Sequence, residues 1–436
     1  MRVDPEPSDD VVGVSTRVDA PGTRNSGPVL ALAAALTVVA ATAVVAWRGV
    51  VVTAGGRDQT LFHLPTIQKF RAEFPQLNVV DVATATGPLF HIVIAAIAAA
   101  FGLGVAATQI AGSLFAGAAA ATATSVAGER TVGDRLLIVA PLLLSAYFWQ
   151  SALWLNTDDA ALLFTLVALA LLARRQPDAM SFALIGAAAA AAVATRQTNA
   201  WVLVPIGLTA LVFGADLRGR LVAGFAGCLP ATLVLAYLVH AWGGFTPPAF
   251  AELNGIAGSG AALSYGLALA GFFGLPILLA TGGVPARRHL GLGAVVGVLG
   301  AIPAVVFPSW TTADETRRGG WLWTAVDRFP AIADRSPLLI AGAVFGGIVA
   351  TLVLARIERR LALIVASSYL AAAVVFTFGS RLYQRYFELP LAALALLTLA
   401  WLFANGAIVR RWPLLGLAAA QAVLLAGIVG YPVLTG

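Results

Sequence analysis

The chain has 436 residues, of which 59% are hydrophobic and only 11% are charged, and its mean hydropathy is +0.88. Soluble globular domains carry about 25% charged residues, so this composition excludes them and indicates a polytopic membrane protein. The net charge of +6 comes almost entirely from arginine, which stands in pairs between apolar runs rather than on one basic face. This pattern indicates cytoplasmic anchoring of helices and argues against nucleic-acid binding.

The N-terminal end divides into a polar tail and a first apolar run. Residues 1–27 are rich in Asp, Pro, Ser and Gly, which predicts a disordered cytoplasmic tail. The run over 28–47 is longer than the core of a signal peptide and lacks a small-residue cleavage site, so we expect an uncleaved transmembrane helix. Residues 28–436 are then expected to form one integral membrane domain.

Arginine-bearing connections recur along the rest of the chain and divide it into apolar runs. If these connections are cytoplasmic, the helices between them pair as hairpins. With the first helix, about thirteen spans are expected, so the predicted fold class is an all-α transmembrane bundle. The connections are Arg130/Arg135, Arg174-Arg175, Arg218/Arg220, Arg287-Arg288, Arg356/Arg359-Arg360 and Arg410-Arg411. The further spans are 105–126, 135–152, 159–173, 178–195, 198–214, 220–242, 260–281, 289–308, 336–355, 360–378, 388–404 and 412–432.

One more apolar segment, 86–103, needs a different interpretation. Counting it as a span would place Asp58 and Asp158 on opposite sides of the membrane. Its Gly-Pro start permits a half-embedded or re-entrant helix instead. We therefore expect residues 48–104 to form one large outer loop, and almost every informative polar residue then falls in outward connections. This places the chemistry on the outer face of a multi-pass protein of the cell membrane.

A polar run, Thr195 to Trp201, interrupts a long apolar stretch and is the strongest functional signal. Polar residues at membrane depth are costly and usually mark function. Arg196 offers planar, bidentate donors suited to phosphate, and Gln197 and Asn199 could complete a pocket for a phosphate or a sugar hydroxyl. Interfacial snorkelling explains a lone arginine, but it leaves the polar neighbours of Arg196 unexplained.

Carboxylates in the outer connections are candidates for proton transfer. Asp58 and His63 in the first loop could supply a general base, although on this motif alone a solvated loop with ordinary polar residues is the better explanation. Asp158 and Asp159 precede an apolar helix, where helix capping accounts for much of the signal. Two adjacent carboxylates exceed what a cap requires, so one of them, with Asp158 the better candidate, is expected to serve a substrate or a divalent metal.

Two later outer loops combine charge with aromatic residues. Asp314 and Arg317 stand shortly before Trp321 and Trp323, and Arg385 stands beside Tyr386. Arginine on the outer side runs against the positive-inside trend and suggests contact with a phosphate or a sugar. The chain has no Walker A, Rossmann glycine or nucleophile-elbow motif. The sequence therefore shows no motif for soluble nucleotide-sugar chemistry.

Taken in order, these segments resemble the eukaryotic α-1,2-glucosyltransferases that add the terminal glucose to the dolichol-linked oligosaccharide of asparagine-linked glycosylation. The chain looks like a bacterial-like relative of that family. The matching stretches are Gln59 to Pro65, Thr86 to Phe90, Asn156-Thr157-Asp158, Arg196 to Asn199, Ala313-Asp314 through Trp323, and Arg385 to Pro390.

The resemblance implies an integral membrane glycosyltransferase of the C-type fold that uses a polyprenyl-phosphate sugar and transfers it with inversion to a glycan or lipid-linked acceptor. It departs at one point, because the family's Asp-Glu pair falls on Gln59-Thr60 and the carboxylate here is Asp58. Either the loop slides by one residue so that Asp58 takes the role, or the acid has moved to Asp158 or Asp159, or the activity is lost or altered.

The roles that follow are hypotheses. Asp58 is the leading base, and Asp158 is the alternative base or metal ligand. The residues expected to bind substrate are His63 and Gln197 on sugar hydroxyls, Arg196 with Arg385 or Arg317 on the phosphate, and Asn199 and Asp314 in the same site.

A transporter or flippase of lipid-linked saccharides is the alternative function. It predicts inverted repeats and polar residues at the bilayer midplane. The polar residues here cluster at outward helix ends, and no internal repeat is evident.

Overall fold

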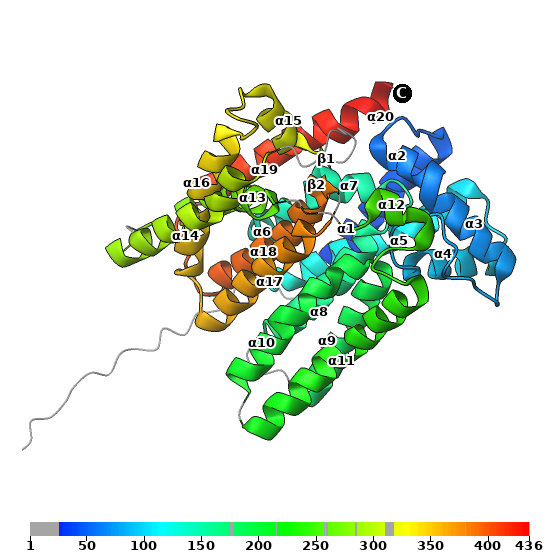
Figure 1. Cartoon of the computed structure of the whole chain (residues 1–436), viewed down its shortest axis with the longest axis horizontal. Helices are drawn as coiled ribbons and strands as arrows, with labels where there is room; N and C mark the ends of the chain where they lie inside the picture. The colour runs from blue at the N-terminus through cyan, green and yellow to red at the C-terminus, as the bar shows by residue number, and fades with distance from the viewer. Residues whose placement is uncertain are drawn as a thin grey trace, which may run out of the picture.

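The computed structural model describes residues 26–174, 178–214, 216–256, 258, 260–283, 286–309, 318–379 and 381–435. Within these ranges the chain is helical, and its one sheet is a parallel pairing of two residues each from β1 (Arg318–Gly319) and β2 (Leu382–Tyr383). Figure 1 shows the helices in neighbouring groups, with α8 to α11 side by side in one group and α13, α14 and α16 in another.

The described residues contain nine helices that are long and apolar enough to cross a membrane, or ten if one bent pair counts as a span. This supports a multi-pass membrane protein. The helices are α1 (Ser26–Arg48), α5 (Val105–Val126), α11 (Leu217–Trp242), α13 (Ala262–Thr281), α14 (Arg287–Val306), α16 (Pro337–Leu354), α17 (Arg359–Thr377), α18 (Gln384–Ala404), and the continuous run α19 (Trp412–Leu425), η5 (Ala426–Gly430) and α20 (Tyr431–Thr435).

The expected number of about thirteen spans also counted three shorter helices. They are α8 (Asp158–Leu172), α9 (Ala179–Thr195) and α10 (Leu203–Phe213), with 15, 17 and 11 residues. A full span needs about 20 residues, so these three do not meet the length criterion by themselves. α8 packs against α9, and α9 and α10 both pack against the 26-residue α11.

The expected single helix over 135–152 is two helices in the structure. α6 (Val132–Leu143) and α7 (Ala146–Ala152) meet at an angle of 73°. Pro141 lies near the end of α6, and the side chain of Ser145 accepts a hydrogen bond from the Tyr147 N–H at 3.3 Å. A proline weakens the preceding turn and a serine N-cap starts a new helix, so the chain turns here.

The first loop folds into short helices rather than extended chain. α2 (Ala54–Asp58), the π turn η1 (Gln59–His63) and α3 (Leu64–Glu73) run on without a break, and α4 (Leu89–Ala100) packs against α3. With 12 residues, α4 is about 18 Å long and too short to cross a bilayer. Its half-embedded position stays a prediction.

The last short elements lie between the long helices. η3 (Pro248–Phe250) and α12 (Ala251–Asn254) follow α11, and α15 (Trp321–Arg328) precedes α16. α18 is the most enclosed of the long helices, since 78% of its apolar 18-residue stretch is buried inside the protein. It therefore holds its first turn, which carries Arg385, on the most firmly packed element of the chain.

Glycine allows α16 to approach α13 closely. A Cβ at Gly346 would collide with the backbone carbonyl of Leu267 on α13, and Gly347 packs in the same way against Gly297 on α14. We expect Gly346→Ala to cost about 1–3 kcal/mol of stability, because the two backbones must separate. Thermal unfolding of the purified protein in detergent checks this, with Gly291→Ala as the control, since nothing lies within 4 Å of that added Cβ. Equal unfolding midpoints for the two variants would contradict the close packing.

Candidate functional site

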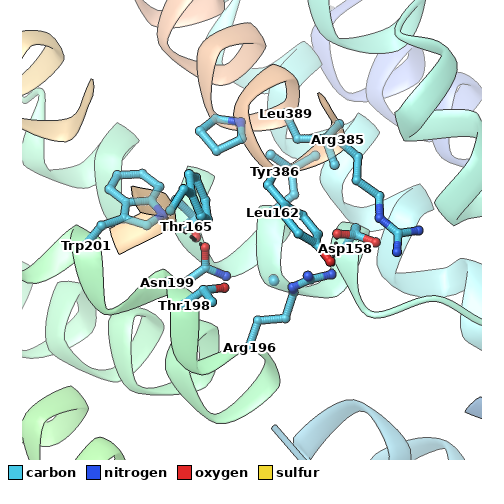
Figure 2. Close-up of a pocket in the computed structure, with 13 residues that line it drawn as sticks. Asp158, Leu162, Thr165, Arg196, Thr198, Asn199, Trp201, Arg385, Tyr386 and Leu389 are labelled. Carbon is cyan, nitrogen blue, oxygen red and sulfur yellow. Dashed lines mark hydrogen bonds and ion pairs between the residues drawn. The ribbon is translucent and has the colours of Figure 1, made fainter. Parts of the chain in front are cut away.

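One pocket lies where α8, the 3₁₀ turn η2 (Gln197–Val202), α17 and α18 meet. The space within it, together with the open solvent at its opening, is about 390 Å³. Figure 2 shows that its two ends differ in chemistry, with charged groups at one end and the aromatic ring of Trp201 at the other. The charged end is formed by Asp158, Arg196 and Arg385, and the remaining lining residues are Ala161, Leu162, Thr165, Thr198, Asn199, Trp201, Phe376, Tyr386, Leu389 and Pro390.

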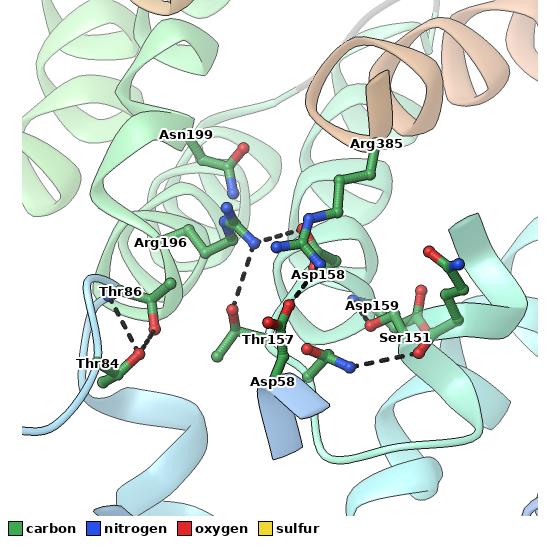
Figure 3. Close-up of polar contacts among 12 residues, drawn as sticks. Asp58, Thr84, Thr86, Ser151, Thr157, Asp158, Asp159, Arg196, Asn199 and Arg385 are labelled. Carbon is green, nitrogen blue, oxygen red and sulfur yellow. Dashed lines mark hydrogen bonds and ion pairs between the residues drawn. The ribbon is translucent and has the colours of Figure 1, made fainter. Parts of the chain in front are cut away.

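Four charged residues predicted from the sequence meet at the charged end. Arg196 forms a salt bridge with Asp158 through Nη1 and Oδ1, and Arg385 Nη1 lies 2.9 Å from Asp58 Oδ2. Figure 3 shows the two pairs next to each other, although their members come from four separate segments of the chain. The structure therefore brings together Asp58, Asp158, Arg196 and Arg385.

Asp58 is held in place by tight packing of the turn before it. A Cβ at Gly55 would lie 2.7 Å from the Gln150 carbonyl, and one at Gly56 would overlap the backbone of Val51. Thr53 caps α2 by accepting a hydrogen bond from the Gly56 N–H at 3.1 Å. The glycine pair thus lets the end of α2 sit against the α7 region, where Asp58 reaches Arg385.

Arg196 stands at a break between helices. Its backbone is extended, with φ −146° and ψ 110°, between the end of α9 and the start of η2. Gly87 packs directly on the carbonyl of Ala194 and leaves no room for a side chain there. The polar run is therefore a turn between two apolar helices, and the turn aims Arg196 at Asp158.

Tyr386 lies between the two guanidinium groups. Its ring centroid is 4.8 Å from Cζ of Arg196 and 5.6 Å from Cζ of Arg385, and Tyr383 contacts Arg385 at 5.3 Å. Aromatic faces attract cations, so the rings and the two carboxylates offset the repulsion between the arginines.

A buried network supports the first turn of α18. Glu388 accepts hydrogen bonds from Ser145 Oγ at 2.7 Å and from Gln384 Nε2 at 2.7 Å. Gln384 Oε1 in turn accepts from Tyr265 and from the backbone of Leu322 on α15. These contacts fix the turn that carries Arg385 and Tyr386, and they arise because α6 and α7 bend at Ser145.

His63 is paired with another histidine rather than with a carboxylate. Its Nδ1 lies 2.9 Å from Nε2 of His91, and both rings are buried. Burial lowers the pKa of His63 well below its usual range, and the neighbouring His91, Arg385 and Arg196 lower it further. The ring is therefore neutral at pH 7. It can act there as a hydrogen-bond donor or acceptor but not as a cation.

This lowered pKa predicts a pH dependence of stability. Below about pH 6.5 the unfolded chain takes up a proton at His63 that the folded chain does not, so stability falls by about 1.4 kcal/mol per pH unit down to the folded pKa. We expect the unfolding midpoint to drop between pH 7.5 and 5.5, and to drop less in His63→Gln. The exposed His240 provides the matched control, His240→Gln. The same midpoint drop in His63→Gln as in the wild type would contradict the neutral pair.

Two other predicted residues have different surroundings. Gln197 Nε2 donates to the carbonyls of Ala85 at 2.8 Å and Phe245 at 2.9 Å, so its amide ties two loops together outside the pocket. This geometry does not favour contact with sugar hydroxyls. Asn199 lines the pocket, and its Oδ1 accepts from Trp201 Nε1 at 3.1 Å.

Asp314 and Arg317 lie outside the described residues. Among those that are described, no group of three His, Cys, Asp or Glu side chains could hold a metal ion. Asp158 is engaged by Arg196, and Asp159 is buried behind it with its N–H on Ser151 Oγ at 3.1 Å. Both carboxylate oxygens of Asp159 lack a hydrogen-bond partner among the described residues, and a divalent metal at Asp158 and Asp159 stays a prediction.

Tyr386, Thr165 and His91 are site residues that sequence reasoning missed. Tyr386 follows Arg385 directly, so the neighbouring arginine was an available signal. Thr165 lies two helical turns beyond Asp158, inside an apolar run, and nothing marks it.

Comparisons of the chain with protein-family models, with curated proteins and with solved structures find no match.

Proposed function

We propose that the protein is an inverting membrane glycosyltransferase that moves a hexose such as glucose from a polyprenyl-phosphate donor to an acceptor hydroxyl. The observation that carries the proposal is the pocket, which joins two Asp–Arg pairs at one end to an apolar, aromatic lining at the other. A polyprenyl-phosphate sugar has the same division between an anionic head and an apolar chain.

The arginines are suited to the donor phosphate. Guanidinium groups bind phosphate bidentately, and the helix starts of α8 and α18 both lie at the charged end. Arg196 and Arg385 are each paired with an aspartate. A phosphate that draws Arg385 toward itself releases Asp58, which then becomes a free carboxylate beside the reaction centre.

The reaction follows from this exchange. Asp58 takes the proton from the acceptor hydroxyl while the acceptor oxygen forms a bond to the anomeric carbon. The bond from that carbon to the phosphate oxygen breaks, and its electron pair stays on the polyprenyl phosphate, where Arg196 and Arg385 stabilise the added charge. One displacement inverts the anomeric centre. Asp158 is the alternative base. Both aspartates pair with an arginine, but the Asp158 side chain is 8% exposed and that of Asp58 is 26% exposed, so Asp58 is the more accessible to an acceptor hydroxyl.

The π turn accounts for the offset from the resembled family. In that pattern the acid stands four positions before the His, whereas Asp58 stands five positions before His63. Residues four apart share a face in an α-helix, and residues five apart do so across an i→i+5 turn. Gln59–His63 is such a turn, since the Leu64 N–H bonds to the Gln59 carbonyl. It supports the alternative in which the loop slides and Asp58 takes the role.

The test uses the purified full-length protein in liposomes with a panel of labelled polyprenyl-phosphate sugars. Transfer of label to a lipid or glycan acceptor, with an inverted anomeric linkage, supports the proposal. Movement of the intact labelled donor across the bilayer, without cleavage of the sugar–phosphate bond, would support the flippase instead. Reporters fused after Asp58, Asp158 and Arg196 test the outer-face location, and all three should report the same side.

A further inference from the structure

Arg135 is a buried cation that has no hydrogen-bond partner among the described residues and does not line the pocket. Only 2% of its surface is exposed, and Nε, Nη1 and Nη2 have no hydrogen-bond partner in the part of the chain that the structure describes. A guanidinium stays charged at any physiological pH, and an uncompensated buried charge costs several kcal/mol. Such a group requires an anion that the described chain does not supply.

The nearest acid in the sequence is already engaged. Asp134 accepts two hydrogen bonds from Arg411, at 2.7 Å from Nε and 3.2 Å from Nη2. Arg130, which precedes α6, is itself a cation and donates to the carbonyl of Ala400 at 2.9 Å. Burial lowers the pKa of Arg130, Asp134 raises it, and the nearby charge of Arg135 lowers it further. The region therefore carries an excess of positive charge.

Arg135 lies at the end of the bundle opposite the pocket. It stands in the first turn of α6, ten residues or about 15 Å before Ser145, which contacts the Glu388 network. A Cβ on Gly27, in the first turn of α1, would be 3.6 Å from Arg135 Nη1. The first N–H groups of a helix lack intrahelical acceptors and favour anions.

The guanidinium of Arg135 lies close to the protein surface. Val132, Gly133 and Leu136 on the same turn of α6 are exposed, and the neighbouring Gly27 has no side chain. Arg135 is thus one residue layer beneath the surface, at a helix end where lipid phosphates lie in a membrane. A phosphate provides the oxygen pair that a guanidinium fork binds.

We propose that Arg135, together with Arg130 and the first turn of α1, binds a phosphate oxyanion at the membrane surface opposite the pocket. The phosphate comes from a phospholipid headgroup or from inorganic phosphate. This site does not depend on the proposed transfer reaction.

The test measures the unfolding midpoint of the delipidated full-length protein in a neutral detergent. Phosphatidylglycerol, diacylglycerol with the same chains, and inorganic phosphate are added separately to the wild type, to Arg135→Met and to the control Arg218→Met, which removes an exposed arginine. We expect phosphatidylglycerol to raise the midpoint of the wild type and of the control by about 3 °C or more at saturation, and diacylglycerol to leave both unchanged.

Arg135→Met should lose this response and, without ligand, should unfold no earlier than the wild type, because it removes an uncompensated charge. If that variant does not fold, Arg130→Met should show a weakened phosphatidylglycerol response. An equal shift with inorganic phosphate assigns the site to soluble phosphate, and a shift with phosphatidylglycerol alone assigns it to the lipid headgroup. A full phosphatidylglycerol response in Arg135→Met, or none in the wild type, would overturn the proposal.

Discussion

Asp58→Asn is expected to lower the turnover of sugar transfer by a factor of about 10² to 10⁴, the usual contribution of a general base. Asparagine keeps the shape of the side chain and can still accept a hydrogen bond from Arg385, so the fold should not change. It removes the charge that competes with the donor phosphate for Arg385, and KM for the donor should therefore stay equal or fall. A drop in kcat without a rise in KM is the signature to measure in liposomes.

Two further variants sharpen this result. Asp81→Asn is the control, because the Asp81 side chain is 79% exposed and pairs with Lys69 on the same loop. Adding Gln59→Asp to Asp58→Asn should not restore transfer, because Gln59 is buried and already engaged. Its Oε1 accepts a hydrogen bond from the Leu155 N–H at 2.8 Å, and its Nε2 donates to Gln109 Oε1 at 3.1 Å. Wild-type turnover in Asp58→Asn, with a loss in Asp158→Asn, would move the base to Asp158.

Arg196→Ala is expected to reduce both transfer and stability. It removes a donor to the leaving phosphate, a loss of about 10²-fold or more in turnover, and it breaks the salt bridge of the buried Asp158, which keeps only Arg385 as a neighbouring cation in the pocket lining. Breaking one side of a buried pair costs about 3 kcal/mol, so the unfolding midpoint should fall as well.

The double variant Arg196→Gln/Asp158→Asn separates the two effects. It removes both charges, so the midpoint should recover while transfer stays low. Arg57→Gln serves as the control, since Arg57 is an exposed arginine next to Asp58. Near-normal transfer in the double variant would mean that Arg196 acts only as the partner of Asp158.

Hydropathy predicted the helices whose ends are marked by glycine or charge. The expected span 105–126 coincides with α5 (Val105–Val126), which lies between Gly104 and Gly128. The break between α6 and α7 was missed, because the run over 135–152 stays apolar through Ser145. One serine within an apolar run is ordinary. Ser145 becomes informative only through its hydrogen bond to Glu388 on α18, which the sequence does not show.

The site was predictable as a set of residues but not as a set of pairs. Topology placed Asp58, Asp158, Arg196 and Arg385 at one end of the bundle, where they do meet. Which arginine faces which aspartate depends on helix packing, since Asp58 and Arg385 are 327 positions apart. The π turn before His63 has no sequence signal of its own, because it differs from an α-helix only in hydrogen-bond spacing.

The four charges of the two Asp–Arg pairs at the charged end of the pocket cancel. A cleft lined by one sign of charge draws its ligand from a distance and raises the association rate, an effect that salt weakens. Two matched pairs generate little field beyond their own dimensions, so the pocket exerts no such pull on soluble anions. Under the proposed function, selectivity is then expected to arise after a ligand has arrived by lateral diffusion in the bilayer, which favours a membrane-borne phosphate over phosphates in solution.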